Sequence, residues 1–338
     1  MEETQQNHRS WVEVVNKYNS PDIRKSIWQI INSLGPYVLL WAAMYYSLGI
    51  SYLLTLALAI LAAGFLVRMF IIFHDCGHGS FFRSKMANRI VGTILGSLVF
   101  TPYDYWHREH AIHHKTVGNL DKRGSGDVWT LTVEEYIQRS SAKRLLYRLY
   151  RNPILLLGLG PFFLFVLWFR IPRKTMNKEG RLSVHVSNLI VLIYSVSLIL
   201  LMGWKAFLMI QLPVIYMATV AGVWLFYVQH QYEDVIWTRQ EDWDYKTMAM
   251  EGSSYMKFPR LLQWFSGNIG YHHIHHLSPM IPNYKLEQCH RENRMFDHIK
   301  PVTFIPSLRT LSLRLWHEKA GRLISFRQFR KLSPAPSP

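Results

Sequence analysis

Histidine is the residue type with the most evident capacity for chemistry in this sequence, because most of its copies gather in four short stretches. The first stretch, HDCGH, holds two histidines four residues apart, and residues at this spacing share one face of a helix. Two later stretches, HAIHH and HHIHH, each hold histidines at i, i+3 and i+4, which again share one face. Neutral imidazole binds iron, zinc, copper or nickel far better than magnesium or calcium, so the pattern predicts a transition-metal site. The clustered histidines are His74, His78, His107, His110, His113, His114, His230, His272, His273, His275 and His276.

One same-face set from each stretch gives the candidate metal ligands. These are His74, His78, His110, His113, His114, His230, His272, His275 and His276. A structural zinc ion takes about four ligands, so this set fits two metals with open positions better than one zinc. His107 is not needed to complete its triplet, and His273 points about 100° away from His272 on a helix. Both are therefore predicted to lie beside the site without binding metal.

Acidic residues next to these stretches could hold the imidazoles in place. A metal-bound histidine usually gives its second N–H to a carboxylate or a carbonyl, which fixes its tautomer. Asp75, Glu109, Asp121 and Asp127 are placed for this role, although the sequence does not pair them with particular histidines. The sequence has no HExxH motif, so a zinc metalloprotease is not supported.

The elements that must position these histidines are long apolar runs. Four runs, at 27–50, 51–73, 184–202 and 206–229, have about the 20 residues that a membrane-spanning helix needs. Basic residues flank the runs, as the positive-inside rule describes. The formal charge of +16 therefore fits membrane orientation and does not call for nucleic acid as a partner. The sequence predicts an all-α integral membrane protein with four transmembrane helices and a helical cap that holds the di-metal site.

Two weaker apolar runs lie at 90–102 and 153–169, and the number of membrane crossings that the histidine stretches allow decides whether these runs can span the membrane. If the histidine stretches bind together, all lie on one side of the membrane, and the number of crossings between His114 and His230 is even. The first run is too short to span, and the second carries Gly158, Gly160 and Pro161 at its centre, which favour a break. Whether either run is re-entrant or interfacial stays open. Parity predicts four spans in the cell membrane, with both termini and the metal site cytoplasmic.

Composition divides the chain into three parts. Residues 1–26 are polar, which predicts a cytoplasmic segment without a cleavable signal peptide. Residues 27–331 are predicted to form a single membrane domain, and residues 332–338 a disordered tail. The two cysteines, Cys76 and Cys289, fall in parts predicted to be cytoplasmic, so no disulfide framework is expected.

The motifs HDCGH at 74–78, HAIHH at 110–114 and HHIHH at 272–276 resemble the three histidine boxes of the membrane fatty acid desaturase and hydroxylase superfamily. The resemblance includes their spacing and their order relative to the membrane spans. It extends to FHDCGHGSFF, GNLDKRGSGDVWTLTVEEY, FYVQHQYED and GNIGYHHIHHLSPMIPNYKLE, which resemble the acyl-lipid desaturases of Gram-positive bacilli, the Δ5 type in particular. The likeness covers roughly residues 25–330.

This resemblance implies that the nine histidines bind two ferrous ions, with His230 as the isolated ligand at the end of the fourth span. In animal acyl-CoA relatives an asparagine one turn before this histidine holds a metal-bound water. Phe226 stands there in this sequence, so that role is not carried over, and Asn268 or a water is left as its replacement. Zinc could occupy the site in purified protein, since imidazole sites generally bind zinc more tightly than ferrous iron. The predicted neighbours of the ligands are Asp75, His107, Glu109, Asn268 and His273.

The implied reaction is an O2-dependent insertion of a cis double bond into a lipid acyl chain. Removing hydrogen from an unactivated methylene requires a stronger oxidant than any side chain, which implies metal chemistry. Each turnover needs two electrons, and the resemblance implies ferredoxin or flavodoxin as the external donor. It favours a phospholipid acyl chain as substrate, while CoA and carrier-protein esters and the double-bond position stay open. The runs 90–102 and 153–169 are candidates for lining the path of the acyl chain.

A hydroxylase of the same superfamily and a metal transporter are the two alternative functions. A hydroxylase of the same superfamily would carry the same histidine boxes, and only its product would distinguish it. A metal transporter usually needs ionisable groups near the bilayer midplane. The four runs carry essentially none there, because Arg68, His185 and Lys205 lie near their ends.

Overall fold

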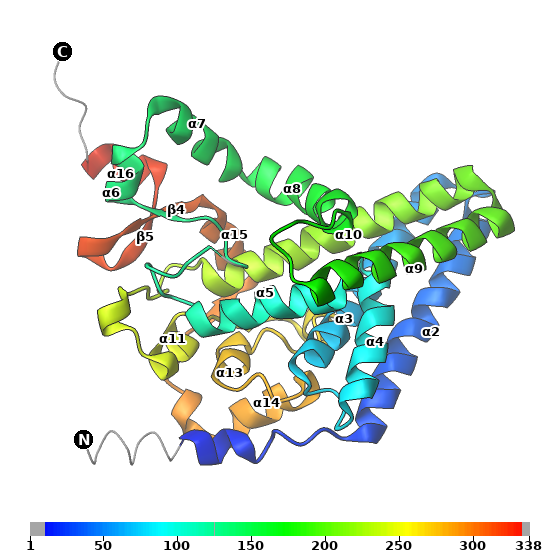
Figure 1. Cartoon of the computed structure of the whole chain (residues 1–338), viewed down its shortest axis with the longest axis horizontal. Coiled ribbons are helices and arrows are strands. Elements are labelled where there is room, and N and C mark those ends of the chain that lie inside the picture. The colour runs from blue at the N-terminus through cyan, green and yellow to red at the C-terminus, as the bar shows by residue number, and fades with distance from the viewer. Residues whose placement is uncertain (1–10, 125, 333–338) are drawn as a thin grey trace.

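The computed structural model describes residues 11–124 and 126–332 and is built around two antiparallel helical hairpins (Figure 1). α2 (Ile23–Ser47) packs against α3 (Tyr52–His78), and α9 (Lys178–Met202) against α10 (Trp204–His230). The turns of both hairpins lie at the right of Figure 1, and most of the short elements gather at the opposite end. The predicted tail lies, apart from Leu332, outside the described residues, as do the first ten residues of the N-terminal segment.

Local residues set the boundaries of these helices. The Asp22 carboxylate caps α2 by accepting hydrogen bonds from the backbone N–H groups of Arg24 and Lys25. α3 ends after His78 because Gly79 adopts the left-handed conformation, with φ of 75°. With 27 residues, α3 is about 40 Å long, whereas the hydrocarbon core of a bilayer is about 30 Å thick. α3 is therefore longer than the hydrocarbon core is thick.

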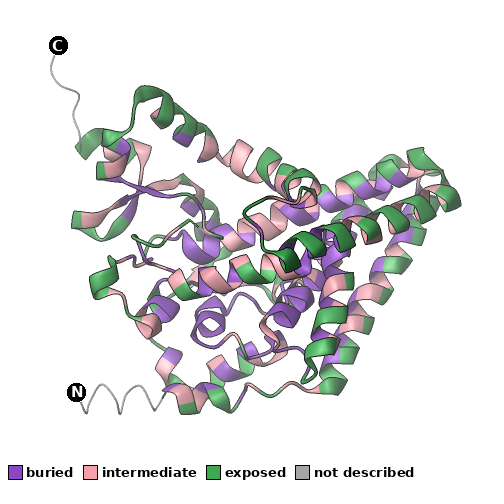
Figure 2. Cartoon of the chain, viewed as in Figure 1, coloured by how far each residue is buried: buried purple, intermediate pink, exposed green. Residues whose placement is uncertain are grey.

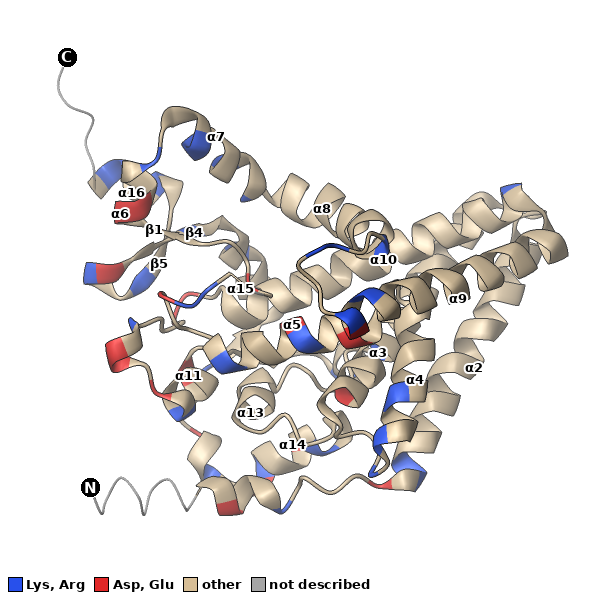
Figure 3. Cartoon of the chain, viewed as in Figure 1, with Lys and Arg blue, Asp and Glu red and all other residues tan. Residues whose placement is uncertain are grey.

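The four long helices agree with the four predicted spans. Within the described residues, α2, α3, α9 and α10 are the helices that are individually long and apolar enough to cross a membrane. The chain itself buries only 11% of the most apolar window of α9, and Figure 2 shows this helix largely exposed. In Figure 3 the hairpins carry few charged residues. Apolar surface of this extent is stable in lipid and not in water, so the chain is a membrane protein.

The run predicted to break is broken in the structure. Residues 154–170 follow α7 (Ser141–Tyr150) at a bend of 57°. Two of their pieces are π-helical, and Pro161, which has no N–H to donate, lies between them. The pieces are η1 (Ile154–Leu159), α8 (Gly160–Phe162), η2 (Phe163–Leu167) and η3 (Trp168–Arg170). Taken with α7 as one span they would make a fifth crossing, so the expectation that this run does not cross the membrane stays a prediction.

Short helices fill the end opposite the hairpin turns. The run 90–102 lies mostly in α4 (Lys85–Leu98), whose 14 residues are too few to span a bilayer. α5 (Tyr103–Thr116) follows and carries the second histidine stretch. Further helices are α6 (Val133–Gln138), η4 (Gln240–Asp242), α11 (Tyr245–Glu251), α12 (Arg260–Phe265), α13 (His272–Leu277), α14 (Asn283–Glu292), η5 (Arg294–Phe296), α15 (Phe304–Arg309), η6 (Thr310–Ser312), η7 (Glu318–Ala320) and α16 (Phe326–Leu332).

The prediction of an all-helical chain needs one correction, because the structure also contains short strands. β1 (Leu131–Thr132) pairs in parallel with β4 (Leu313–His317), which pairs antiparallel with β5 (Arg322–Ser325). β2 (Tyr255–Lys257) and β3 (Pro301–Thr303) form a separate parallel pair. Strands of two to five residues are too short to show a clear alternating pattern, and the parallel pairings join segments far apart in sequence.

Candidate metal centre

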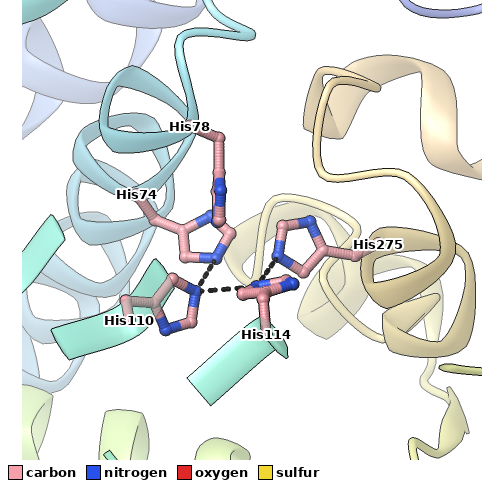
Figure 4. A group of neighbouring side chains, drawn as sticks. All are labelled: His74, His78, His110, His114 and His275. Carbon is pink, nitrogen blue, oxygen red and sulfur yellow. Dashed lines mark hydrogen bonds between the residues drawn. The ribbon is translucent and has the colours of Figure 1, made fainter. Parts of the chain in front are cut away.

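Four helices bring the clustered histidines together at one end of the hairpins. α3 and α10 contribute from their last turns, and α5 and α13 lie across those ends. A first group of five imidazoles comes from α3, α5 and α13, and Figure 4 shows its rings turned toward a common centre. In this group, one ring nitrogen of each residue lies within 4.8 Å of every other. Its members are His74, His78, His110, His114 and His275.

A second group of four imidazoles lies beside the first. It comes from α5, α10 and α13 and meets the same 4.8 Å criterion. Its members are His113, His230, His272 and His276. The rings of His114 in the first group and His276 in the second are stacked, with centroids 4.1 Å apart. α5 and α13 each supply both groups, so the two groups form one centre.

The ring nitrogens converge as ligands of a metal would. The Nε2 atoms of His74 and His110 are 3.0 Å apart, and those of His230 and His272 are 2.9 Å apart. The other neighbouring Nε2 pairs in the two groups lie 3.0 to 3.1 Å apart. Two nitrogens each about 2.1 Å from one metal ion, at right angles, would be about 3.0 Å apart. A neutral imidazole has a single N–H, so hydrogen bonds cannot satisfy so many converging nitrogens, whereas a cation in each group can.

Burial keeps these imidazoles in the form that binds metal. Desolvation, reinforced by the neighbouring imidazoles, lowers the pKa well below the ordinary value of 6.5 at five candidate ligands on α5 and α13. They are His110, His114, His272, His275 and His276. Their rings are therefore neutral at physiological pH and present a lone pair to a metal.

Asp75 orients His74, a member of the first group. Its Oδ1 lies 3.2 Å from Nδ1 of His74, which leaves Nε2 of that ring for the group. Its Oδ2 accepts hydrogen bonds from the backbone N–H of Asn283 at 2.7 Å and from its side-chain amide at 2.8 Å. The amide of Asn283 also pairs with that of Gln29 on α2. This buried network fixes His74 relative to α2 and α14.

Two further acceptors orient the second group. Nδ1 of His113 is 2.6 Å from Oδ1 of Asp127, and Nδ1 of His230 is 3.4 Å from the carbonyl oxygen of Gly252. In both residues the proton on Nδ1 leaves the Nε2 lone pair for the group.

Comparison with known proteins identifies the family. The model of the family described as fatty acid desaturase matches residues 50–305, which include all nine candidate ligands. The chain is 45% identical over 318 residues to a fatty acid desaturase of Bacillus subtilis (strain 168), covering 94% of this chain and 90% of that protein. The chain belongs to the fatty acid desaturase family. It is accordingly an enzyme of lipid metabolism.

More distant desaturases match a smaller part of the chain. An omega-3 fatty acid desaturase of the endoplasmic reticulum from Vigna radiata var. radiata is 31% identical over 244 residues, or 65% of this chain and 60% of that protein. An sn-1 acyl-lipid omega-3 desaturase (ferredoxin) from Nostoc sp. (strain 36) is 28% identical over 253 residues, or 69% of this chain and 64% of that protein.

The predicted neighbours of the ligands lie in different surroundings in this desaturase. His107 is exposed on α5, outside both histidine groups. His273 is fully buried, but its ring packs against Tyr255 and Phe296 and joins neither group. Glu109, half-buried on α5, is likewise a member of neither group.

Asn268 and Asp121 are also placed by the structure. Asn268 has a left-handed backbone, with φ of 59°, and its amide donates to the carbonyl oxygen of Asn283 at 3.2 Å. It therefore contacts the residue that supports Asp75. Asp121 lies at the surface, where it binds Arg239 and takes no part in either group.

Two aromatic residues that the metal-site prediction left out contact the histidine groups. The ring of Trp106 stacks on His110, with centroids 4.3 Å apart, and packs against Phe73 of α3. The ring of Phe226 lies 5.5 Å from that of His113 and 5.4 Å from that of His230. Phe73 and Phe226 precede the ligands on α3 and α10, so these aromatic rings lie on the membrane side of the centre. Trp106 and Phe226 each lie four residues before a candidate ligand, His110 or His230, so helical spacing could have placed both rings on the ligand face.

Arg151 is a second feature that the sequence did not reveal. It is buried just after α7, and its guanidinium donates to the side chains of Thr130, Tyr227 and Gln231 at 2.9 to 3.0 Å. It also donates to the carbonyl oxygen of Leu313 at 2.8 Å. His230 lies between Tyr227 and Gln231, so Arg151 fixes the end of α10 that carries this candidate ligand.

Proposed function

We propose that this desaturase holds two iron ions with its nine candidate histidine ligands and uses O2 to insert a cis double bond into a membrane lipid acyl chain. The observation that carries the proposal is the convergence of the imidazoles into two adjacent groups of five and four. Such a donor set suits iron or zinc, and the family's reaction requires a redox metal.

The first group would hold one ion and the second group the other. When bound, the two ions would supply the oxidising power that no side chain has. The protein's own residues keep the ligands neutral and orient their rings: Asp75 through His74, and Asp127 through His113. Purified protein that contains zinc would be consistent with this proposal, because imidazole sites generally prefer zinc to ferrous iron.

The acyl chain would reach the centre from its membrane side. Trp106 and Phe226 lie there, each half-buried and each against one histidine group. Such rings can press a flexible chain into one position, and a small misplacement would change which carbons react. The broken segment 154–170 supports the same direction of approach, because Phe165 of η2 packs on Phe70, which packs on Trp106.

A phospholipid acyl chain is the proposed substrate, with Δ5 as the proposed double-bond position. The substrate is supported by relatives whose names specify acyl-lipids. The position rests on the likeness to the desaturases of bacilli. The electron donor is proposed to be a ferredoxin or flavodoxin, supported by relatives named with ferredoxin. It would dock on the cytoplasmic side, where the termini are proposed to lie.

The fatty acid profile of a host without desaturases tests this function. The host would express the chain or its His275→Ala variant, together with a competent electron donor. A new monoenoic acid that is absent with the variant is expected, and its double-bond position identifies the regiochemistry. A hydroxylated acyl chain would instead make the enzyme a hydroxylase. An unchanged profile, with both proteins inserted in the membrane, would contradict the proposed substrate.

A further inference from the structure

Two short helices follow the parallel strands β2 and β3. Tyr255, Met256 and Lys257 of β2 pair in register with residues 301–303 of β3. Because the strands are parallel, the chain leaves both at the same end. β2 leads into α12 and β3 into α15, so both helices begin from the same end of the strand pair.

Both helices expose large apolar side chains. On α12, Leu261 is 66% exposed and Trp264 is 37% exposed. On α15, Ile305 is 61% exposed and Leu308 is 45% exposed. Exposed side chains of this size, on two helices that begin from one strand pair, form an apolar surface that needs a cover.

α12 packs against the span α3 at a depth where the bilayer excludes water. The ring of Phe65 contacts Trp264 and Phe265 of α12, with centroids 5.7 Å and 5.1 Å away. Phe65 lies 13 residues after the first residue of α3, about 20 Å from the hairpin turn. The hydrocarbon core is about 30 Å thick, so α12 contacts α3 within it.

The same span supplies a cation that secures α12. The guanidinium of Arg68 lies 3.9 Å from the ring centroid of Trp264 and also donates to the carbonyl oxygen of that residue. This contact fixes the end of α12 on α3 and leaves the Leu261 face outward.

α15 packs against the other hairpin, nearer the membrane boundary. The ring of Trp224 on α10 lies 5.6 Å from that of Phe304 and 5.9 Å from that of Phe258, which joins β2 to α12. Trp224 lies 20 residues after the first residue of α10, about 30 Å along that helix. Figure 1 shows α15 beside the end of α10 that is remote from the hairpin turn.

Exposed basic residues flank this apolar surface. Lys257 ends β2, Arg260 begins α12 and Arg309 ends α15, and all three side chains are exposed. Apolar side chains bordered by lysine and arginine are typical of helices that lie in a membrane interface with anionic lipid. We infer that α12 and α15 are embedded in one leaflet of the bilayer, where Lys257, Arg260 and Arg309 bind anionic phospholipid headgroups. The surface is continuous with the apolar faces of α3 and α10, which favours lipid over a protein partner.

Site-directed spin labelling of the full chain tests this inference. Single cysteines would replace Leu261 and Ile305, while the native Cys76 and Cys289 are buried. Leu192→Cys on the exposed face of α9 serves as the lipid reference, and Glu287→Cys on α14 as the water reference. The protein would be placed in vesicles of equal parts phosphatidylcholine and phosphatidylglycerol. Collisions of each label with O2 and with a water-soluble nickel chelate would then be measured.

Labels at 261 and 305 are expected to collide with O2 and to be shielded from nickel, as at 192. Nickel accessibility equal to that at 287 would overturn the inference and leave the surface for a protein partner. The double variant Lys257→Glu and Arg260→Glu is expected to raise nickel accessibility at 261 several-fold. No change with this variant would overturn the part played by anionic headgroups. The measurement requires neither metal bound to the histidine groups nor catalytic turnover, so its outcome is independent of the proposed chemistry.

Discussion

At the scale of single residues, carboxylates decide which ring nitrogen of a histidine faces the metal centre. Asp75 and Asp127 contact Nδ1 of His74 and His113, one in each histidine group, and so leave Nε2 turned inward. One histidine in each group is therefore oriented by an acid that would not itself touch the metal.

Replacing Asp127 with asparagine should weaken the second group selectively. Asp127→Asn keeps the size of the side chain but removes the charge that holds the Nδ1 proton of His113. Metal affinity or activity should fall about 10- to 100-fold, as is usual for such partners. Metal content and product yield would be measured on the purified protein.

Asp121→Asn is the matched control, because Asp121 is exposed and binds Arg239 away from both groups. It should leave metal content and yield close to those of the unmodified chain. Equal losses in the two variants would contradict the role given to Asp127.

The neutral imidazoles predict a pH dependence of stability. At His110, His114 and His275 the pKa lies well below 6.5 in the folded chain and returns to about 6.5 on unfolding. Below about pH 6.5 the unfolded chain therefore binds more protons than the folded chain. The free energy of unfolding of the metal-free protein should be fully retained above this pH and fall below it.

Thermal unfolding in detergent micelles, followed from roughly pH 8 down to pH 5.5, would show this fall as a lower midpoint. The His275→Gln variant should show a shallower fall, because it has one such group fewer. A midpoint that rises with acidification would be inconsistent with buried neutral rings.

Part of the site could be predicted from residue types and spacing, and part could not. The i, i+3 and i+4 pattern placed the histidines of α5 and α13 on common faces, and the structure brings them together. The support from Asn283 was not predictable, because it meets Asp75 across 208 residues and Gln29 across 254. Contacts of that range depend on how the hairpins pack, and no local pattern encodes them.

At the scale of helices and strands, Arg151 connects α7 to the end of α10 and to β4. Its guanidinium is buried among hydroxyl, amide and carbonyl groups. An arginine can serve several acceptors at once because its donors form a rigid fork. The position of the second histidine group thus depends on a residue outside it.

Arg151→Met should destabilise the protein by about 2–4 kcal/mol, because it leaves several buried acceptors without a donor. It should also lower metal content through His230. Arg151→Lys should recover part of the stability and part of the metal content, since lysine restores the charge but donates fewer hydrogen bonds. Thermal unfolding and metal analysis would be compared with Lys143→Met, an exposed change on the same helix. Stability unchanged in Arg151→Met would argue against this anchor.

Long helices were predictable from hydropathy, whereas the shortest elements were not. The break at 154–170 followed from Pro161 and its neighbouring glycines. α12 and α15 have six residues each, fewer than two helical turns, so their apolar residues show no readable period. Their arrangement depends on β2 and β3, which meet across more than 40 residues of sequence.

At the scale of the whole molecule, the number of membrane crossings decides where the termini lie. Four long helices give an even number, and the bent pair of α7 with residues 154–170 would give five if it crossed. An even number places the two ends of the chain on the same side. The proposed orientation places both in the cytoplasm.

Reporter fusions at each end test this topology. Green fluorescent protein fused to either terminus should fluoresce, and alkaline phosphatase fused to either should be inactive, because both ends are expected in the cytoplasm. Opposite results at the two termini would indicate five crossings. The 154–170 segment would then be a span and not a re-entrant loop.

The central claim, that the two histidine groups each hold one metal ion, is tested most directly by the ratio of metal to protein. Three variants on α13 provide the comparison: His275→Ala in the first group, His272→Ala in the second, and His273→Ala in neither. The unmodified chain should bind two metal ions. His275→Ala and His272→Ala should each lower the ratio toward one, and His273→Ala should leave it at two. A ratio of one in the unmodified chain, or a loss in His273→Ala as large as in its neighbours, would contradict the account.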